Sequence, residues 1–183
     1  MKNITIKEYV KLSLEEKMIY EPLACMVQQD KFAGIQFDIK KLTYNDVKGV
    51  MRTLPNFNEW KPTLDIYETC YKIEEDVFWQ SLITDYFSTR GFIVEKFKAL
   101  KKRENDLLRG PDIDVMLYEN AGGKRLDPFS ELLPLKQLGE IYGQYPLDLA
   151  KKPYNEIITL LVMHKTSQEV DKRYQELTKD LKL

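Results

Sequence analysis

The chain has 183 residues and a formal net charge of −1 at pH 7, with 43% hydrophobic, 11% aromatic and 31% charged residues. This length and composition are typical of a folded protein of one or two domains, and they exclude a largely disordered chain. Because nucleic-acid-binding proteins usually carry a clear surplus of basic residues, the near-neutral charge counts against a non-specific nucleic-acid binder.

The sequence gives no sign of export or membrane insertion. Residues 1–8 lack the apolar segment of a secretory signal, and the longest apolar-rich run, Ile157–Met163, is too short to cross a bilayer. We therefore expect a cytoplasmic protein with no membrane partner. The two cysteines, Cys25 and Cys70, lie far apart and have no histidines near them, so they predict neither a zinc site nor a disulfide framework.

The first elements in chain order are helix starts. Thr5 with Glu8, and Ser13 with Glu16, have the spacing of capping boxes, in which a hydroxyl and a later carboxylate accept from free amides. The second box predicts a helix from Leu14 to Gln29. Pro22 predicts a kink or break in that helix, and Gly34 ends the helical pattern.

The next segment reads as a short turn followed by a helix. Asp38 is placed to cap a turn over Ile39–Leu42, and Thr43 with Asp46 is placed to cap a helix over Tyr44–Thr53. Pro55 ends that helix.

The middle of the chain predicts long helices. From Thr63 to Arg109 there is no proline and one glycine, and apolar residues recur at three- and four-residue steps. We expect helices over Thr63–Tyr71 and Glu74–Lys102, with a bend in the second at Gly91.

The C-terminal part begins after Gly110 and Pro111. Residues 112–118 fit an extended or a helical segment equally well, and residues 121–124 predict a loop. Asp127 with Pro128 marks a helix start, and a further helix is expected over Leu133–Tyr142 with Gly143 as its C-terminal cap. Pro153 begins an apolar helix through Met163, and a capping box at Thr166 opens a separate polar helix.

One stretch occurs twice. Residues 38–51 return 110 positions later as residues 148–161, with the Asp, Lys, Tyr and Asn positions identical. The repetition indicates either a duplication or independent reuse of one helical turn. The expected fold is therefore all-α, with two short helical units flanking a long central helix or helical hairpin. The expected segments are 1–55, 56–110 and 111–183.

Few residues suggest catalysis. His164 is the only histidine, and its place at the end of an apolar helix favours a role at the helix C-terminus. Asp112 and Asp114, followed by Glu119 and Lys124, are a weak candidate for a magnesium site, because the spacing does not fit the acid-and-lysine pattern of metal-dependent nucleases. We expect a protein that is not an enzyme and has no cofactor, no metal and no catalytic residues.

A nucleic-acid role is the alternative. Residues 96–103 form the sharpest basic run, although cations in the last turns of a helix are expected from the helix dipole. Residues 138–163 also fit a helix-turn-helix with Gly143 in the turn, but the second helix is apolar nearly all round. The candidate contacts are Lys96, Lys98, Lys101, Lys102 and Arg103.

Aromatic residues are concentrated in the middle of the chain. Most are expected in the core, but aromatic residues are also enriched in protein interfaces. A surface formed by them is the best candidate for binding another protein, and self-association is a further expectation. The candidate residues are Trp60, Tyr71, Phe78, Trp79, Tyr86 and Phe87.

Two segments resemble a known class of proteins. Residues 147–157, LDLAKKPYNEI, and the opening residues 4–17 are similar to small helical morphogenesis proteins of phages, tail assembly chaperones in particular. Those proteins carry a short helix, a Pro-Tyr or Thr-Tyr step and an apolar helix. The central aromatic helices do not follow that pattern. The resemblance implies a non-enzymatic protein that binds phage structural proteins during assembly, in the host cytoplasm or in the virion.

Overall fold

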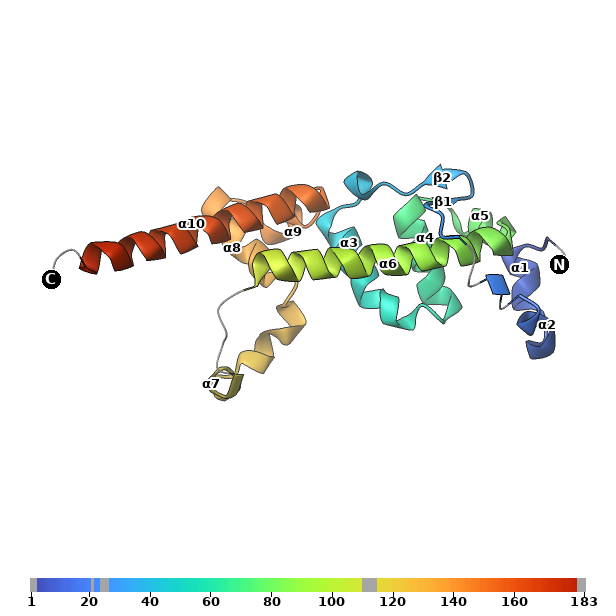
Figure 1. Ribbon diagram of the computed structural model, residues 1–183, viewed down its shortest axis with the longest axis horizontal. Helices are drawn as coiled ribbons and strands as arrows, with labels where there is room; N and C mark the ends of the chain where they lie inside the picture. The colour runs from blue at the N-terminus through green and yellow to red at the C-terminus, as the bar shows by residue number, and fades with distance from the viewer. Residues whose placement is uncertain (1–2, 21, 24–26, 110–114, 181–183) are drawn as a thin grey trace. The chain divides into compact units, whose positions relative to one another are not determined.

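The computed structural model describes residues 3–20, 22–23, 27–109 and 115–180. The fold is all-α, as predicted, and the described strands form one small hairpin (Figure 1). Contacts divide the chain into two compact units. Unit 1 comprises Met1–Leu42 and Asp46–Lys101, and unit 2 comprises Thr43–Asn45 and Lys102–Leu183. This division does not coincide with the predicted boundaries at residues 55 and 110.

Unit 1 begins with two short helices whose starts follow the predicted capping boxes. In α1 (Ile6–Val10) and α2 (Leu14–Met18), the side chains of Thr5 and Ser13 accept from the amides of Glu8 and Glu16. Each glutamate accepts in return from the amide of its cap residue at 2.8 Å. Both helix starts therefore follow from local sequence alone.

The helix predicted to run to Gln29 is wrong, because α2 ends at Met18 and a β-hairpin follows within the described residues. Strands β1 (Lys31–Phe32) and β2 (Ile35–Gln36) are joined by Ala33 and Gly34, which have φ values of 49° and 79°. Two successive positive φ values are the requirement of a tight hairpin turn, and glycine meets it at little cost. Gly34 thus forms part of a hairpin turn and does not end a helix as predicted.

The long helical region contains three helices, α4 (Trp60–Tyr71), α5 (Glu75–Gln80) and α6 (Ile83–Leu108). The break falls at residues 81–82, and α6 passes through Gly91 without interruption. The predicted single helix over Glu74–Lys102 is therefore wrong. The cause is tertiary: the Ile6 amide donates to the Ser81 carbonyl at 2.9 Å, and the Ile83 amide donates to the Ile4 carbonyl at 2.9 Å. Pairing with the N-terminal segment holds residues 81–82 extended.

The core of unit 1 is aromatic. The fully buried Tyr67 ring lies within 4.6 to 6.1 Å, centroid to centroid, of five other rings. Ring pairs at such separations each add about 0.5–1.5 kcal/mol beyond simple burial. The helices α4, α5 and α6 and the hairpin of unit 1 are held around this cluster. The rings named in these pairs are Phe32, Phe57, Tyr71, Phe78 and Tyr86, with Tyr67 at the centre.

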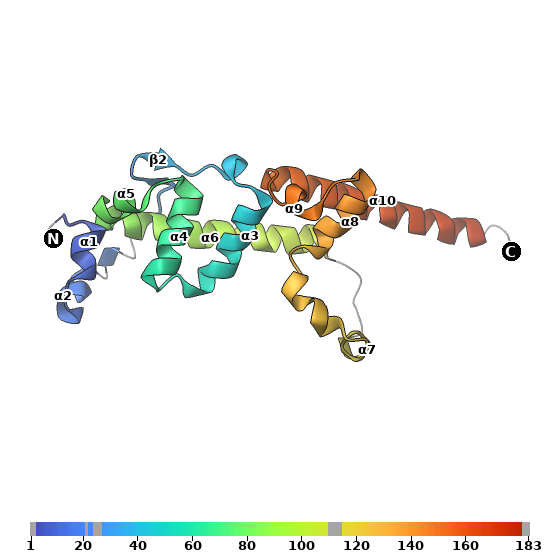
Figure 2. The ribbon, with the colours of Figure 1, turned by 180° about the vertical axis from the view of Figure 1, so that it is seen from behind.

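Unit 2 is built from residues 102–108 of α6 and five further elements, which can be followed in Figures 1 and 2. These are α7 (Val115–Asn120), the 3₁₀-helix η4 (Gly123–Phe129), α8 (Leu133–Tyr142), α9 (Pro146–Leu149) and α10 (Tyr154–Asp180). The bounds of α8 and its left-handed cap at Gly143, with φ 63°, agree with the prediction. The separate helix predicted from Thr166 is wrong, since α10 continues through it to Asp180.

The repeated stretch has a structural counterpart. Its first copy forms the 3₁₀-helix η2 (Ile39–Lys41), capped by Asp38, and then α3 (Tyr44–Thr53), while the second copy supplies α9 and the start of α10. In unit 2 the copies pair at equivalent positions. Thr43 forms an antiparallel bridge with Pro153, and the rings of Tyr44 and Tyr154 stack at 6.3 Å. Equivalent residues facing one another in this way indicate a local two-fold arrangement.

Candidate protein-binding surface

The predicted aromatic partner residues lie in unit 1. Tyr71, Phe78 and Tyr86 are buried, so these three are corrected: they pack in the aromatic core and present no surface to a partner. Trp60, Trp79 and Phe87 are half-buried at the edge of that core. A partner role for these three stays a prediction.

An exposed apolar groove lies instead in unit 2, between η4, α8 and the turn that leads into α9. It encloses about 300 Å³, and seven of its eight lining residues are apolar or aromatic. We call it the unit 2 groove. Its lining residues are Leu126, Phe129, Leu132, Leu133, Lys136, Tyr145, Pro146 and Leu147.

Local sequence explains why α9 lies beside α8. Gly143 takes a left-handed conformation that ends α8, and the Gln144 amide donates to the Gly139 carbonyl at 3.1 Å. A Cβ on Gly139 would lie 2.5 Å from the Gln144 carbonyl oxygen, so a glycine is needed where the chain returns. Pro146 at the first position of α9 then starts the next helix with its φ already set. The turn places Tyr145 and Leu147 against the side of α8.

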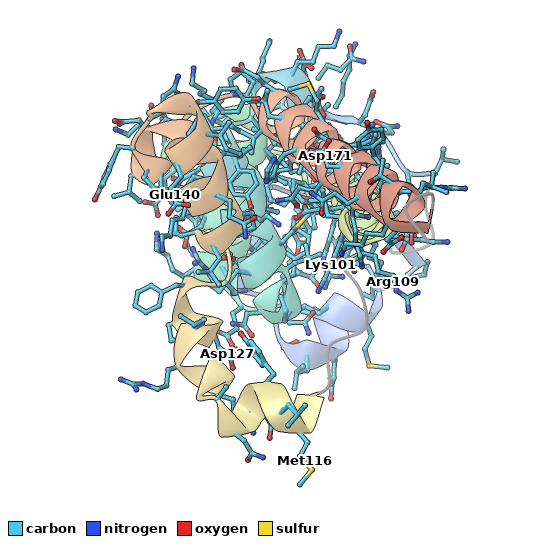
Figure 3. All side chains as sticks on the ribbon, turned by 90° about the vertical axis from the view of Figure 1, so that its left-hand side faces the viewer. Lys101, Arg109, Met116, Asp127, Glu140 and Asp171 are labelled. Atoms are coloured by element: carbon cyan, nitrogen blue, oxygen red, sulfur yellow. The ribbon has the colours of Figure 1, made fainter. Side chains whose placement is uncertain are left out.

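Several apolar side chains of the unit 2 groove are exposed to solvent. Tyr145 is 66% exposed, and Leu126, Phe129 and Leu147 are also exposed. In α7, Met116 is also 74% exposed and projects into solvent (Figure 3). An exposed apolar groove is typical of a binding site.

The chemistry of the groove is that of binding. Lys136 is its one charged lining residue, and its ammonium lies 3.8 Å from the Glu140 carboxylate. The other lining residues are Tyr145 and six apolar or aromatic residues. The groove can therefore bury apolar side chains of another protein, with Lys136 at its edge available to an acidic group.

The pair of repeat tyrosines forms the buried centre of unit 2. The Tyr154 hydroxyl donates to Glu104 Oε2 at 3.1 Å, and the Tyr44 hydroxyl donates to the Glu131 carbonyl at 3.3 Å. Burial raises the pKa of both phenols well above the usual value, and the negative charge of Glu104 raises each pKa further. Both phenols therefore stay neutral and act in packing.

His164 lies inside α10 rather than at a helix end, so the predicted role at a C-terminus is wrong. It lines a groove of about 650 Å³ together with Arg109, Lys165 and Glu169. The Lys165 ammonium donates to the Leu107 carbonyl at 3.1 Å and lies 3.5 Å from the Glu169 carboxylate. These contacts give Lys165 a role in joining α10 to the end of α6 within unit 2.

The predicted basic run does not form one binding face. The run lies inside α6, which continues to Leu108. The prediction that these cations occupy the end of a helix is therefore wrong. At about 100° per residue, Lys98, Lys101 and Lys102 share one side of the helix, whereas Lys96 and Arg103 lie on the other. Lys96 is half-buried, and Lys98 lies 3.1 Å from the Glu95 carboxylate. DNA contact by these residues stays a prediction.

The helix-turn-helix alternative places a recognition helix at the start of α10. There, Tyr154, Ile157, Ile158 and Leu161 are buried in unit 2. Asn155, Glu156 and Thr159 in the same turns are exposed, so the helix-turn-helix interpretation stays a prediction.

The remaining candidate residues are the two cysteines and the residues of the predicted magnesium site. Cys70 is buried, and burial raises the pKa of its thiol. Asp112 and Asp114, like Cys25, lie outside the described residues, while Glu119 and Lys124 form an ion pair at 2.9 Å. Among the described residues, no cluster of histidine, cysteine and acidic side chains has the arrangement of a metal site.

The sequence matches no known family model, and comparison with curated proteins and with solved structures gives no match. Within the described part of the chain, every helix is too short or too polar to cross a membrane.

Proposed function

We propose that this protein is a non-enzymatic assembly factor of phage particles, a tail assembly chaperone or a virion component, and that it binds another phage protein through the unit 2 groove. The observation that supports binding is the groove itself, with seven apolar or aromatic lining residues and a single charge. The similarity of residues 4–17 and 147–157 to phage morphogenesis proteins supports the assembly role.

The size and composition of the groove suggest what it binds. About 300 Å³ accommodates a few apolar side chains, as presented along one side of a helix or an extended segment. Aromatic side chains such as Phe129 and Tyr145 are typical anchors of protein interfaces, since they bury a large area with few rotatable bonds. The partner is therefore an apolar segment of a structural protein that is unshielded before assembly.

The test is a pull-down from the natural host cells with the full chain as bait. The groove variant combines Phe129→Glu with Leu147→Glu, which adds two charges to the apolar lining. The matched control combines Asn155→Asp with Gln175→Glu, which adds the same charge at exposed positions of α10. We expect the wild type and the control to retain a phage structural protein and the groove variant to lose it.

Salt separates this proposal from nucleic-acid binding. An apolar interface should persist when salt is raised from about 0.1 to 0.5 M, whereas DNA affinity should fall steeply over the same range. Capture that does not depend on the groove, or sub-micromolar DNA binding that salt abolishes, would refute the proposal.

A further inference from the structure

A second groove lies within unit 1, between the end of α3, the 3₁₀-helix η3 (Leu54–Asn56) and the middle of α6. It encloses about 350 Å³, and we call it the unit 1 groove. Of the ten described residues that line it, six are apolar, one is Asn58 and three are cations. The apolar residues are Met51, Leu54, Pro55, Phe57, Val94 and Phe97, and the cations are Arg90, Lys98 and Lys101.

The cations are spread along the groove. At 100° per residue, the five lining residues on α6 fall within about 100° of the helix surface, so they share one side. At 1.5 Å per residue, Lys98 and Lys101 lie about 12 and 16 Å along the helix from Arg90. Val94 and Phe97 lie between the two ends. The groove therefore has positive charge at both ends and apolar side chains in the middle.

Arg90 is held in place, but its charge is not balanced by these contacts. Its Nη2 donates to Asn58 Oδ1 at 2.7 Å, and its guanidinium carbon lies 5.3 Å from the centroid of the buried Phe57 ring. Both partners are neutral. The buried Nε has no hydrogen-bond partner among the described residues. A carboxylate brought to this half-buried cation would form a charge-assisted hydrogen bond, which is stronger than a neutral one.

The two lysines at the other end are exposed to a ligand. The Lys98 ammonium lies 3.1 Å from the Glu95 carboxylate, but both side chains of this pair are exposed, and such a pair contributes little. Lys98 can therefore exchange Glu95 for a carboxylate of a ligand. With Arg90, the lining carries three positive charges, which favour a ligand with more than one carboxylate.

The apolar residues of the groove decide which kind of anion fits. A nucleic-acid strand uses cations for its phosphates and exposed aromatic faces for its bases. Phe57 and Phe97 are only 3% and 1% exposed, so they form the floor of the groove and offer no face for stacking. Pro55 and Asn58 are exposed at its edge. An open groove of this kind suits a peptide chain that passes along it better than an enclosed small molecule.

We propose that the unit 1 groove binds an acidic and apolar peptide segment of a partner protein. One carboxylate of the segment pairs with Arg90, and a second pairs with Lys98 and Lys101. Apolar side chains between the two carboxylates cover Val94 and Phe97. The span of about 12–16 Å corresponds to four or five residues of extended chain, or to two or three turns of helix. This site is additional to the unit 2 groove, with which it shares no lining residue.

Selection from a random peptide library by mRNA display, with the immobilised full chain as target, tests the proposal. A library of about twelve residues covers both the extended and the helical spacing. We expect the enriched peptides to share two acidic residues that flank apolar ones at one of these spacings. Fluorescence anisotropy of the most enriched peptide, labelled with fluorescein, then measures its affinity for the wild type and for the variants.

The groove variant combines Lys98→Glu with Lys101→Glu at exposed positions of α6. The matched control combines Lys40→Glu with Lys41→Glu, which makes the same change of charge at exposed positions of unit 1 outside the groove. We expect the wild type and the control to bind the peptide equally. The groove variant should bind it at least about tenfold more weakly, because like charges then face each other across the interface.

Arg90→Met tests the other end of the groove. It removes the charge and keeps a long apolar side chain, so it should also weaken peptide binding by at least about tenfold. Far-UV circular dichroism and tryptophan fluorescence show whether this variant is folded. The groove variant changes exposed lysines to glutamates, which favour helix about equally, so it tests the proposal even if Arg90→Met unfolds.

The proposal would be overturned if no peptide is enriched, if the enriched peptides lack acidic residues, or if they bind the groove variant as well as the wild type. A single-stranded oligonucleotide that binds more tightly than the peptide, and that the groove variant loses, would assign the lysines to nucleic acid instead. The unit 2 variant with Phe129→Glu and Leu147→Glu should still bind the peptide. Failure at one groove is therefore distinguishable from failure at the other.

Discussion

Two buried tyrosines one helical turn apart provide a direct test of the unit 1 core. Tyr67 and Tyr71 both lie on α4 with almost no exposed surface, and their rings stack at 5.8 Å. The Tyr67 hydroxyl donates to the Tyr86 carbonyl at 2.9 Å and lies 2.9 Å from the Thr89 hydroxyl. The buried Tyr71 hydroxyl has no hydrogen-bond partner among the described residues. The same substitution should therefore have different effects at the two positions.

We expect Tyr67→Phe to lower the free energy of unfolding of unit 1 by about 0.5–1.5 kcal/mol, because it removes the buried hydrogen bonds of this hydroxyl while Thr89 Oγ1 keeps its bond to the Asp85 carbonyl. Tyr71→Phe removes a buried hydroxyl that has no partner among the described residues, so its effect should be neutral or stabilising by up to about 1 kcal/mol. For a unit of this size, a difference of 1 kcal/mol corresponds to about 4–8 °C in Tm.

Tryptophan fluorescence in a urea titration measures this difference in unit 1. The chain contains two tryptophans, Trp60 and Trp79, and both belong to unit 1. The signal therefore follows that unit even if unit 2 unfolds separately. Equal destabilisation by the two substitutions would refute the reasoning, because it would mean that the Tyr71 hydroxyl stabilises the core as much as the hydrogen-bonded Tyr67 hydroxyl does.

Three further predictions concern single residues. We expect Gly139→Ala to lower the free energy of unfolding by about 1–3 kcal/mol, because the added Cβ would meet the Gln144 carbonyl. Gly49→Ala should raise it by about 0.5–1 kcal/mol, because the space around the added Cβ in α3 is open. Urea denaturation of both variants checks that the two changes have opposite signs. Because burial raises the pKa of the Cys70 thiol, alkylation at pH 8 mapped by peptide mass should be far slower at Cys70 in the native protein than in urea. Burial also raises the pKa of Tyr154 above its usual value of 10.0. The contribution of this phenol to stability is therefore complete below pH 10 and is lost as the pH rises further. Above about pH 10, the stability measured by circular dichroism should fall less steeply in Tyr154→Phe than in the wild type.

Features set by neighbouring residues could be predicted from the sequence. The caps at Thr5 and Ser13 and the glycine cap at Gly143 each depend on a few adjacent positions, and the structure confirms all three. The break at residues 81–82 could not be predicted, because its cause is pairing with residues 4–6, far away in sequence. The sequence shows Gly91 as the weakest point of the helix, but there the glycine allows Gln28 to approach, with only 3.3 Å between its side chain and an added Cβ.

The candidate binding surface was missed for a similar reason. Aromatic composition identifies residues that bury well, and it does not say whether they bury in the core or in an interface. Tyr86 lies in the core and Tyr145 lies at the surface, although both are tyrosines. The available signal for the groove was local: Tyr145 and Leu147 flank Pro146 directly after a glycine cap, where the chain must turn at the surface.

The two copies of the repeated stretch begin in the same way and then form helices of different length. Its copies share the start of a helix, and the pairing of Thr43 with Pro153 and of Tyr44 with Tyr154 uses that shared part. They diverge afterwards: α3 ends at Thr53, before Pro55, whereas the second copy has no proline in the corresponding place and α10 continues to Asp180. Because the paired starts fix the beginning of α10 inside unit 2, the added length must leave the core. The exposed residues of α10 from Thr166 to Lys179 therefore lie beyond the repeat, where the first copy has no corresponding helix, and changes there leave the pairing of the two copies intact.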